Sequence, residues 1–306
     1  MRAIVLSEQG AGPTLAELHT PQPGAGEVLV RVQASSVNGF DTAVAAGYLA
    51  GVMEHRFPVV LGKDFAGSVA AVGEGVTRFA AGDRVFGVVT KPYLGDGGFG
   101  EYVVVGEQVG LAKLPDTLDV TTAGALGLAG TAAVDAVKAV SPRSGDTVLI
   151  SGATGGVGAI ALQYVVAAGA RVIATARPGA EADFVRGLGA AEVVDHTGDL
   201  AGQVRAISPD GVDAILHLAG DGVALAALLA ENGRLASTLG VGADQHPAAV
   251  AVMANPVEST LDRLAADASA GRITVPVSRS YALADVPAAF ADFATGTVGK
   301  LAVTVA

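Results

Sequence analysis

Polar and apolar residues alternate along much of the first third of the chain. The segment Val28–Ala34 shows this best, since from position 30 onward apolar residues at even positions alternate with polar residues at odd positions. A period of two is typical of a strand that buries one face. Similar short runs, separated by turn glycines, occur at Arg2–Leu6, Gly67–Val72, Arg84–Val89 and Tyr102–Val105. The chain up to about Leu114 is therefore predicted to form a small β-barrel.

A different rhythm begins near Asp146, where apolar strand-like runs alternate with helical segments. The expected strands are 147–150, 171–176, 192–196, 212–219 and 234–239, with helices at 156–168 and 180–188. Such alternation favours right-handed crossovers and a doubly wound parallel sheet. A helix over Ala123–Val140 would lead into this part. The tail from Thr274 returns to strand-like segments around a short helix near Val286–Phe293.

These patterns predict an α/β chain of two domains, in keeping with its 306 residues. The first would comprise residues 1–120, to which residues 274–306 return. The second, residues 121–273, would contain the doubly wound parallel sheet.

Composition narrows the possible partners. The formal net charge of −11 repels nucleic acid and anionic lipid, so neither is expected as a partner. The uncharged run Thr147–Ala170 is broken by glycines and fits a strand, loop and helix better than a membrane span. The apolar stretch Ala3–Leu6 is too short for a signal-peptide core. Without a cysteine, the chain is expected to be cytoplasmic.

The strongest motif is a glycine-rich loop between an apolar strand and a helix. Its residues are Gly152, Ala153, Thr154, Gly155, Gly156, Val157 and Gly158. Gly155 and Gly156 would let backbone N–H groups reach a pyrophosphate, and Gly158 would allow the helix to pack closely on the strand. Ala153 stands where the fingerprint has its first glycine. Because a second strand follows in order at Arg171, we expect a dinucleotide site rather than a structural turn.

The end of the second strand indicates which dinucleotide binds. An acidic residue there would accept a hydrogen bond from the ribose 2′-hydroxyl of NAD. The spacing from Gly158 leads to Ala176 or Arg177, and neither is acidic. The planar guanidinium of Arg177 suits a 2′-phosphate, which favours NADPH. The alternative is that Arg177 is a solvated loop residue.

Several local strings resemble the medium-chain dehydrogenase/reductase superfamily, and within it the zinc-free quinone oxidoreductases. The strings are Ser36–Asp41, Leu61–Gly67, Val72–Val76, Gly82–Val85, Gly98–Tyr102, the glycine loop and Gly299–Lys300. The resemblance implies a GroES-like β-barrel domain and a Rossmann domain, with the active site in the cleft between them. It also implies a homodimer joined through the edges of the Rossmann sheets.

The zinc ligands of related alcohol dehydrogenases are replaced in this chain. Those enzymes use a cysteine in the segment matching Val37–Asp41, and a histidine and a glutamate in the segment matching Gly62–Asp64. Here the places hold Asn38, Lys63 and Asp64. A lysine ammonium has no lone pair to offer a cation, so no metal site is expected. The histidines show no i, i+4 pairing and are expected mostly at the surface or in loops: His19, His55, His196, His217 and His246.

The resemblance places Asn38 beside the nicotinamide, where its amide would donate to the acceptor oxygen. Otherwise it is an ordinary turn residue. Tyr48 would offer a hydroxyl to the acceptor or pack its ring at the barrel surface. Lys300 matches a lysine near the cofactor cleft, with a solvated charge as the alternative.

Four further residues are expected near the cofactor. Thr131 matches a position near the nicotinamide, or it caps a carbonyl of its own helix. Gly240 and Val241 follow a strand ending at Leu239, which places them at the carboxyl edge where such sheets bind ligands, unless they form a plain turn. His196 falls where relatives have a tyrosine near the adenosine phosphate.

The absence of a Lewis acid indicates the substrate class. Without zinc to stabilise an alkoxide, an unactivated alcohol or ketone is a poor hydride partner. A quinone or an α,β-unsaturated carbonyl (enone) spreads the incoming charge over its own π-system. The sequence thus favours NADPH-dependent, metal-free reduction of such acceptors. The alternatives are an enoyl-thioester or polyketide-tailoring reductase of the same superfamily, and a catalytically idle NADPH-binding redox sensor.

Overall fold

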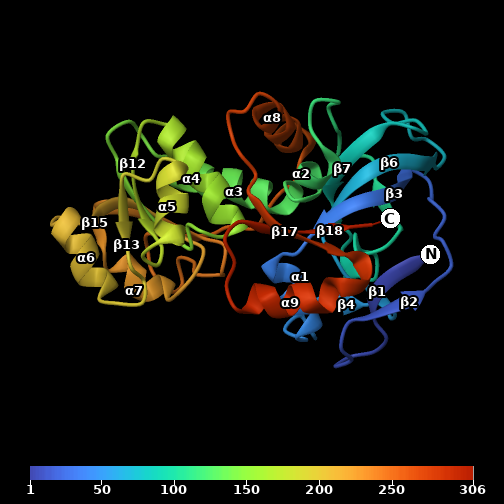
Figure 1. The fold of residues 1–306 in the computed structure, drawn as a ribbon, viewed down its shortest axis with the longest axis horizontal. Coiled ribbons are helices and arrows are strands. Elements are labelled where there is room, and N and C mark those ends of the chain that lie inside the picture. Colours follow the sequence, from blue (N-terminus) through green and yellow to red (C-terminus); the bar gives the residue numbers. More distant parts are fainter. Residues whose placement is uncertain (306) are drawn as a thin grey trace. The chain divides into compact units, whose positions relative to one another are not determined.

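A computed structural model describes residues 1–305 of the chain. By its internal contacts the chain divides into two compact units (Figure 1). The first consists of Met1–Ala129 and Pro256–Ala306, and the second of Gly130–Asn255. The second unit is therefore a continuous insertion in the first. None of the helices described for residues 1–305 has both the length and the apolar character needed to cross a membrane.

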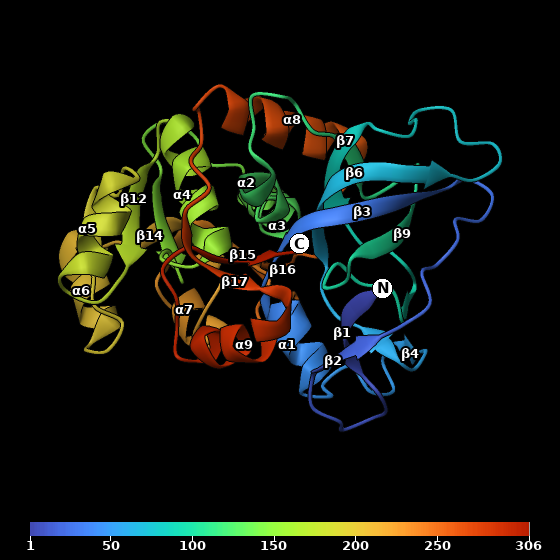
Figure 2. The ribbon, with the colours of Figure 1, turned by 45° about the vertical axis from the view of Figure 1, so that its right-hand side comes forward.

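The first unit is built mainly from antiparallel strands, as expected for a GroES-like domain. Its largest sheet has the order β10-β7-β6-β3-β18-β17, and β9 pairs with β3 outside that path. Figure 2 shows β3 between β6 and β9. The smaller sheets are β2-β1-β5 and β4-β8. The strand bounds are β1 Arg2–Leu6, β2 Thr14–Glu17, β3 Glu27–Ser36, β4 Glu54–His55, β5 Val59–Val60, β6 Asp64–Val72, β7 Arg84–Val88, β8 Tyr93–Leu94, β9 Tyr102–Gly106, β10 Leu111–Lys113, β17 Val277–Ala282 and β18 Lys300–Thr304.

The long strand β3 follows its sequence pattern until its last residues. Arg31 and Gln33 are exposed while their apolar neighbours are buried. Ser35 departs from the pattern, because it is fully buried and its hydroxyl donates to the backbone oxygen of Asp64 at 2.6 Å. The chain's C-terminal strand β18 pairs antiparallel with this end of β3, with Ala302 opposite Ser36.

The helix predicted over residues 123–140 is two helices in the structure. The short helix α2 (Val120–Gly124) begins after Asp119, whose side chain accepts from the N–H of Thr122. A second helix, α3 (Gly127–Val140), starts where the N–H of Leu128 donates to the Asp64 carboxylate at 2.7 Å. Because that anion comes from β6, a distant side chain restarts the helix. The other helices of this unit are α1 Gly39–Ala45, α8 Glu258–Ser269, the 3₁₀ turn η1 Leu283–Asp285 and α9 Val286–Ala294.

The second unit has the doubly wound parallel sheet that the sequence predicts. Its six strands lie in the order β13-β12-β11-β14-β15-β16, and every pairing is parallel. This order reverses direction between β11 and β14, which is the switch point where such sheets bind ligands. The bounds are β11 Thr147–Ser151, β12 Arg171–Thr175, β13 Glu192–Val194, β14 Val212–His217, β15 Leu229–Ser237, β16 Ala249–Ala251, α4 Gly156–Ala167, α5 Ala180–Gly187, α6 Leu200–Ile207 and α7 Gly222–Ala226.

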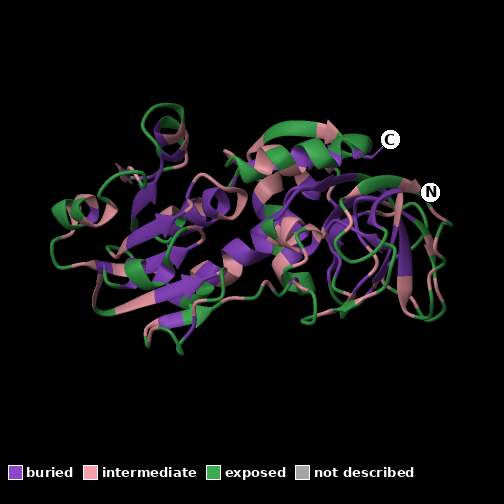
Figure 3. Cartoon of the chain, turned by 90° about the horizontal axis from the view of Figure 1, so that it is seen from below, coloured by how far each residue is buried: buried purple, intermediate pink, exposed green. Residues whose placement is uncertain are grey.

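The central strands of this sheet are buried along nearly their whole length (Figure 3). Leu149, Ile173 and Ile215 are fully inaccessible to solvent. Burial of each such side chain contributes about 1.5–3 kcal/mol. The apolar runs of the sequence are explained by this burial, since helices cover both faces of a doubly wound sheet.

Candidate cofactor site and buried polar cluster

The glycine loop joins β11 to α4 at the carboxyl edge of the parallel sheet. Gly152 has a φ of +81°, which glycine adopts readily, and its N–H donates to Thr175 Oγ1 at 2.9 Å. A Cβ at position 158 would lie 2.2 Å from the backbone oxygen of Gly152. Only glycine therefore lets the first turn of α4 pack directly on the loop. Ala153 fills the place of the fingerprint's first glycine with a fully buried methyl group.

The N-terminus of α4 is open to an anion. Gly155 is its N-cap residue and provides no side-chain cap. The first N–H groups of a helix have no partner within the helix, and the helix dipole favours a negative charge there. A Cβ at position 155 would lie 3.5 Å from the nearest heavy atom, the Gly152 oxygen. The loop from Gly152 to Gly158 thus has the features that a pyrophosphate site requires, namely a helix N-terminus without a side-chain cap and glycines that leave room around it.

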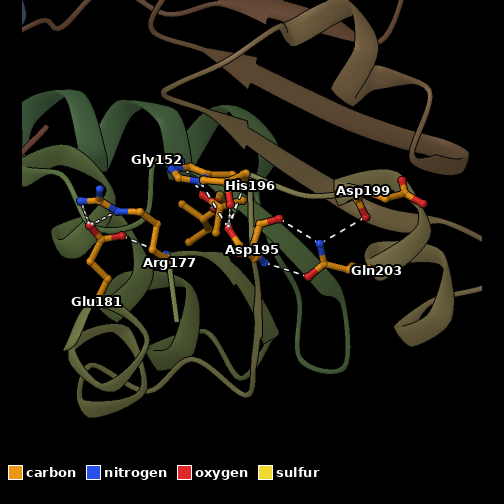
Figure 4. Close-up of polar contacts among 10 residues, drawn as sticks. Gly152, Arg177, Glu181, Asp195, His196, Asp199 and Gln203 are labelled. Carbon is orange, nitrogen blue, oxygen red and sulfur yellow. Dashed lines mark hydrogen bonds and ion pairs between the residues drawn. The ribbon is translucent and has the colours of Figure 1, made fainter. Parts of the chain in front are cut away.

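Arg177 follows β12 and is held by a carboxylate from the start of α5 (Figure 4). Its Nε donates to Glu181 Oε1 at 2.8 Å, its Nη2 donates to the same oxygen, and its backbone N–H donates to Oε2 at 2.9 Å. The arginine side chain is 57% exposed, whereas the glutamate is 14% exposed. The hydrogen bond to Arg177, the largest cause, lowers the pKa of Glu181.

His196 lies next to this pair, just after β13. Its Nδ1 is 3.8 Å from Asp195 Oδ1, and that oxygen accepts two hydrogen bonds from Thr197. Gln203 of α6 accepts from the Asp195 N–H at 2.8 Å and donates to the Asp195 backbone oxygen (Figure 4). The end of β13 is therefore held firmly, and Arg177 and His196, both predicted from the sequence, lie in one neighbourhood.

The ends of β14 and β15 hold a buried histidine, although most histidines of the chain were expected at the surface or in loops. His217, the last residue of β14, is 2% exposed. Its Nδ1 lies 2.9 Å from Ser237 Oγ, and its Nε2 lies 3.0 Å from the Gly220 oxygen. His217 is the exception to that expectation, because its ring ties the loop after β14 to the end of β15. The sequence did hold a signal for this burial, because His217 directly follows the apolar residues Ala214–Leu216.

The strand before Gly240 and Val241 ends earlier than predicted. β15 stops at Ser237 rather than at Leu239, because Ser237 Oγ accepts from the N–H groups of Leu239 and Val241, at 3.1 and 3.2 Å, and turns the chain. Gly240 then adopts a φ of +87°.

Thr131, which was expected near the nicotinamide, is fully buried in α3.

In the first unit a buried polar cluster brings together residues far apart in the chain. Lys300 donates to Asn38 Oδ1 at 2.5 Å and to the Val37 oxygen at 3.0 Å, although Asn38 and Lys300 are 262 residues apart. Asn38 Nδ2 donates to Asp64 Oδ2 at 2.8 Å and to the Ser36 oxygen at 3.2 Å. Lys300 is only 3% exposed, so the alternative of a solvated charge is wrong.

Two further ionisable groups flank this cluster and were missed as functional candidates. Asp41 accepts from the Asn38 N–H at 2.9 Å and is 1% exposed. Burial, with the nearby Asp64 charge second, raises the pKa of Asp41 to about 7. Lys63 donates to the Val89 oxygen at 2.7 Å and lies over the Phe40 ring. Burial lowers the pKa of Lys63 and also that of Lys300.

Tyr48 lies beyond the end of α1, with 78% of its surface exposed. Its ring does not pack at the barrel surface in the way a buried aromatic would. Within residues 1–305, no three His, Cys, Asp or Glu side chains group so that they could hold a metal ion.

Comparison with known proteins places the chain among dehydrogenases. Residues 24–116 match the family model of the alcohol dehydrogenase GroES-like domain, and residues 188–303 match that of the zinc-binding dehydrogenases. The chloroplast envelope quinone oxidoreductase homolog of Arabidopsis thaliana is 32% identical over 248 residues, which are 77% of this chain and 74% of that protein. A phthioceranic/hydroxyphthioceranic acid synthase of Mycobacterium bovis is 36% identical over 224 residues, 72% of this chain but 10% of that protein.

Solved structures agree with this assignment over the whole chain. The quinone oxidoreductase from Coxiella burnetii has a TM-score of 0.91 and 27% identity, covering 100% of this chain and 99% of its own. The mycobacterial protein Rv1454c, in a complex with NADPH, has a TM-score of 0.86 and 30% identity over 99% of this chain and 100% of its own. The chain belongs to the medium-chain dehydrogenase/reductase superfamily and, within it, to the quinone oxidoreductases.

Proposed function

We propose that the protein reduces quinones or α,β-unsaturated carbonyls with hydride from NADPH, without a metal ion. The observation that carries the proposal is the glycine loop, whose shape and open helix N-terminus fit a dinucleotide pyrophosphate. Bound NADPH would supply the hydride from C4 of its nicotinamide. The NADPH complex of the mycobacterial relative and the quinone oxidoreductase names of other relatives support this assignment.

The buried polar cluster supports a reaction without zinc. Where related zinc enzymes have ligands, this chain has Asn38, Lys63 and Asp64, and Lys300 Nζ lies 3.6 Å from Asp64 Oδ2. A divalent cation there would lie near the amines of Lys63 and Lys300. Lys300 already donates to Asn38 Oδ1, an oxygen that a cation would need as a ligand. The acceptor must therefore delocalise the hydride's charge itself, as a quinone or an enone does.

Asn38 is the proposed donor to the acceptor oxygen. Both of its amide hydrogens already donate inside the protein, one to Asp64 at 2.8 Å and one to the Ser36 oxygen at 3.2 Å. The longer bond is the weaker one. We infer that the acceptor oxygen shares the hydrogen that faces Ser36, while Asp64 and Lys300 hold the planar amide in place.

The test is a panel of acceptors followed through NADPH absorbance. We expect oxidation of NADPH with a small quinone and with a cyclic enone, and no reverse reaction with a primary alcohol and NADP⁺. Rapid alcohol oxidation without quinone or enone reduction would overturn the proposal. No turnover with any electrophile would favour an idle redox sensor.

Replacing Asn38 tests its role in the same assay. Asn38→Ala is expected to lower turnover by about 10²–10³-fold, the effect of one lost oxyanion donor, with NADPH affinity little changed. Tyr48→Phe is the companion variant, because loss of a catalytic hydroxyl would lower turnover without disturbing a ring that is 78% exposed. Unchanged turnover in Asn38→Ala would remove Asn38 from the mechanism.

An enoyl-thioester reductase is the second candidate function. The similarity to a segment of the phthioceranic/hydroxyphthioceranic acid synthase favours it. Both reactions place hydride on a conjugated carbon, so the same residues would serve. An α,β-unsaturated acyl thioester added to the panel separates them, since a marked preference for it over free quinones would favour this function.

A further inference from the structure

We propose that Glu181 sets how strongly the protein prefers NADPH over NADH, because it holds the arginine that a 2′-phosphate would contact. The proposal rests on the nicotinamide-dependent function above and concerns only its adenosine end. The residues involved follow β12 and β13, beside the glycine loop (Figure 4).

The carboxylate of Glu181 accepts hydrogen bonds from the same Arg177 donors that a phosphate group would use. One oxygen accepts from Nε and Nη2 of the guanidinium, and the other accepts from the arginine's own N–H. Nε and Nη2 are also donors with which an arginine recognises a phosphate group. An incoming 2′-phosphate must therefore displace Glu181 or share Arg177 with it.

The charges nearby oppose a second anion. Arg177 has two acidic neighbours, Glu181 and Asp195, and both have pKa values lowered from their ordinary range. Both carboxylates are thus ionised near neutral pH. A 2′-phosphate meets one fixed cation and two anions, with the His196 imidazole next to Asp195. An uncharged 2′-hydroxyl meets carboxylate oxygens that can accept its hydrogen.

We therefore expect a modest preference, with NADPH bound less than about tenfold more tightly than NADH. A free arginine would supply charge-assisted hydrogen bonds worth about ten- to a hundredfold in affinity. Glu181→Gln removes the competing charge yet keeps an oxygen that can accept from the Arg177 N–H. This change should tighten NADPH binding about tenfold, and it should not tighten NADH binding.

Binding is measured by titration calorimetry with NADPH and NADH, and with the fragments adenosine 2′,5′-bisphosphate and adenosine 5′-monophosphate. The variants are Glu181→Gln, Arg177→Gln and the double variant. Asp183→Asn is the matched control, because it removes the same charge from the same helix at a side chain that is 78% exposed and pairs with Arg186 instead. We expect the gain from Glu181→Gln to vanish when Arg177 is also replaced, and Asp183→Asn to have no selective effect.

Three results would count against the proposal. The first is a starting protein that already binds NADPH more than about a hundredfold more tightly than NADH. The second is a Glu181→Gln variant whose ratio of the two affinities is unchanged. The third is an equal gain in the Asp183→Asn control, which would show an effect of net charge alone. If neither cofactor binds the starting protein, the nicotinamide-dependent function itself is wrong.

Discussion

At the scale of single residues, burial is the largest cause of the pKa shifts in the polar cluster of the first unit. Asp41, Lys63 and Lys300 lie in one neighbourhood, where burial raises the pKa of Asp41 and lowers the pKa of both lysines. The strings that contain them could be read from the sequence as family motifs. Their grouping could not, because Lys300 reaches Asn38 across 262 residues.

The raised pKa of Asp41 predicts a stability that changes with pH. Its pKa rises from 3.8 to about 7 on folding, so between these values the folded protein holds a proton that the unfolded chain has lost. Stability must therefore fall as pH rises through this range, by roughly 4 kcal/mol at most. Asp41→Asn keeps an oxygen for the Asn38 N–H and removes the titration. Relative to the starting protein, it should gain stability between pH 5 and pH 8.

Denaturant unfolding of both proteins at the two pH values provides the measurement. Asp64, Lys63 and Lys300 face the same group and are present in both proteins, so the comparison isolates the change at Asp41. An equal difference in unfolding free energy at pH 5 and pH 8 would contradict the raised pKa.

Ser237 predicts a second effect at a single residue. Its hydroxyl accepts from two partly buried N–H groups and faces the buried His217 ring, so Ser237→Ala leaves these partners without that hydrogen bond. We expect a loss of about 1–3 kcal/mol of unfolding free energy. Affinity for the cofactor should weaken as well, because the turn that carries Gly240 and Val241 loses its anchor.

Ser269→Ala is the matched control for this change. The Ser269 hydroxyl is buried without a hydrogen-bond partner in the described part of the chain. Its removal should cost nothing or stabilise the protein slightly. A comparable loss in both variants, measured by denaturant unfolding, would show that the Ser237 bonds are not special.

At the scale of elements, periodicity predicted the parallel sheet well and the helix boundaries less well. The runs around Leu149 and Ile173 are apolar because both faces of the strands are covered, and this signal is local. The break between α2 and α3 could not be read locally, since the group that caps α3 is Asp64 of β6. The Arg177–Glu181 pair did have a local signal, the i, i+4 spacing at the start of a predicted helix.

Substitutions at two glycines of the loop are expected to affect cofactor binding and stability differently. A methyl group at Gly155 meets its nearest atom at 3.5 Å, whereas one at Gly158 would lie 2.2 Å from the Gly152 oxygen. Gly155→Ala should therefore fold normally and bind NADPH poorly, because the methyl group obstructs the approach of the pyrophosphate. Gly158→Ala should lose stability as well as binding, since α4 must move away from the loop.

Thermal unfolding and NADPH titration of the two variants measure these effects separately. The starting protein should gain about 2.7 kcal/mol when NADPH is present at a hundred times its dissociation constant. Gly155→Ala should lose this gain without losing its own stability. Full stability and binding in Gly158→Ala would contradict the close packing of the loop against α4.

At the scale of the whole molecule, the chain combines a dinucleotide-binding unit with a unit that has Lys63 at a position matching a zinc ligand of related enzymes, and a second buried lysine, Lys300, beside Asp64. The replacement of a zinc ligand by Lys63 could be predicted from the sequence, because it depends only on which residue stands at that position. The contacts that make it stable could not, because the Val89 oxygen that binds Lys63 and the Asn38 oxygen that binds Lys300 come from other segments.

The last prediction concerns removal of metal from the whole protein. A zinc enzyme loses its Lewis acid on chelation and with it the stabilisation of a developing alkoxide. Here Lys63 takes the place of a ligand and donates to the Val89 oxygen at 2.7 Å, and Lys300 lies 3.6 Å from the Asp64 carboxylate, so this position does not offer a cation the ligands that zinc requires. Dialysis against a chelator should leave the rate of quinone or enone reduction unchanged, and added zinc should not raise it. The measurement is NADPH oxidation before dialysis, after it and after zinc is returned, with the metal content of each sample determined. Loss of turnover that zinc restores would show that this reading of the cluster is wrong.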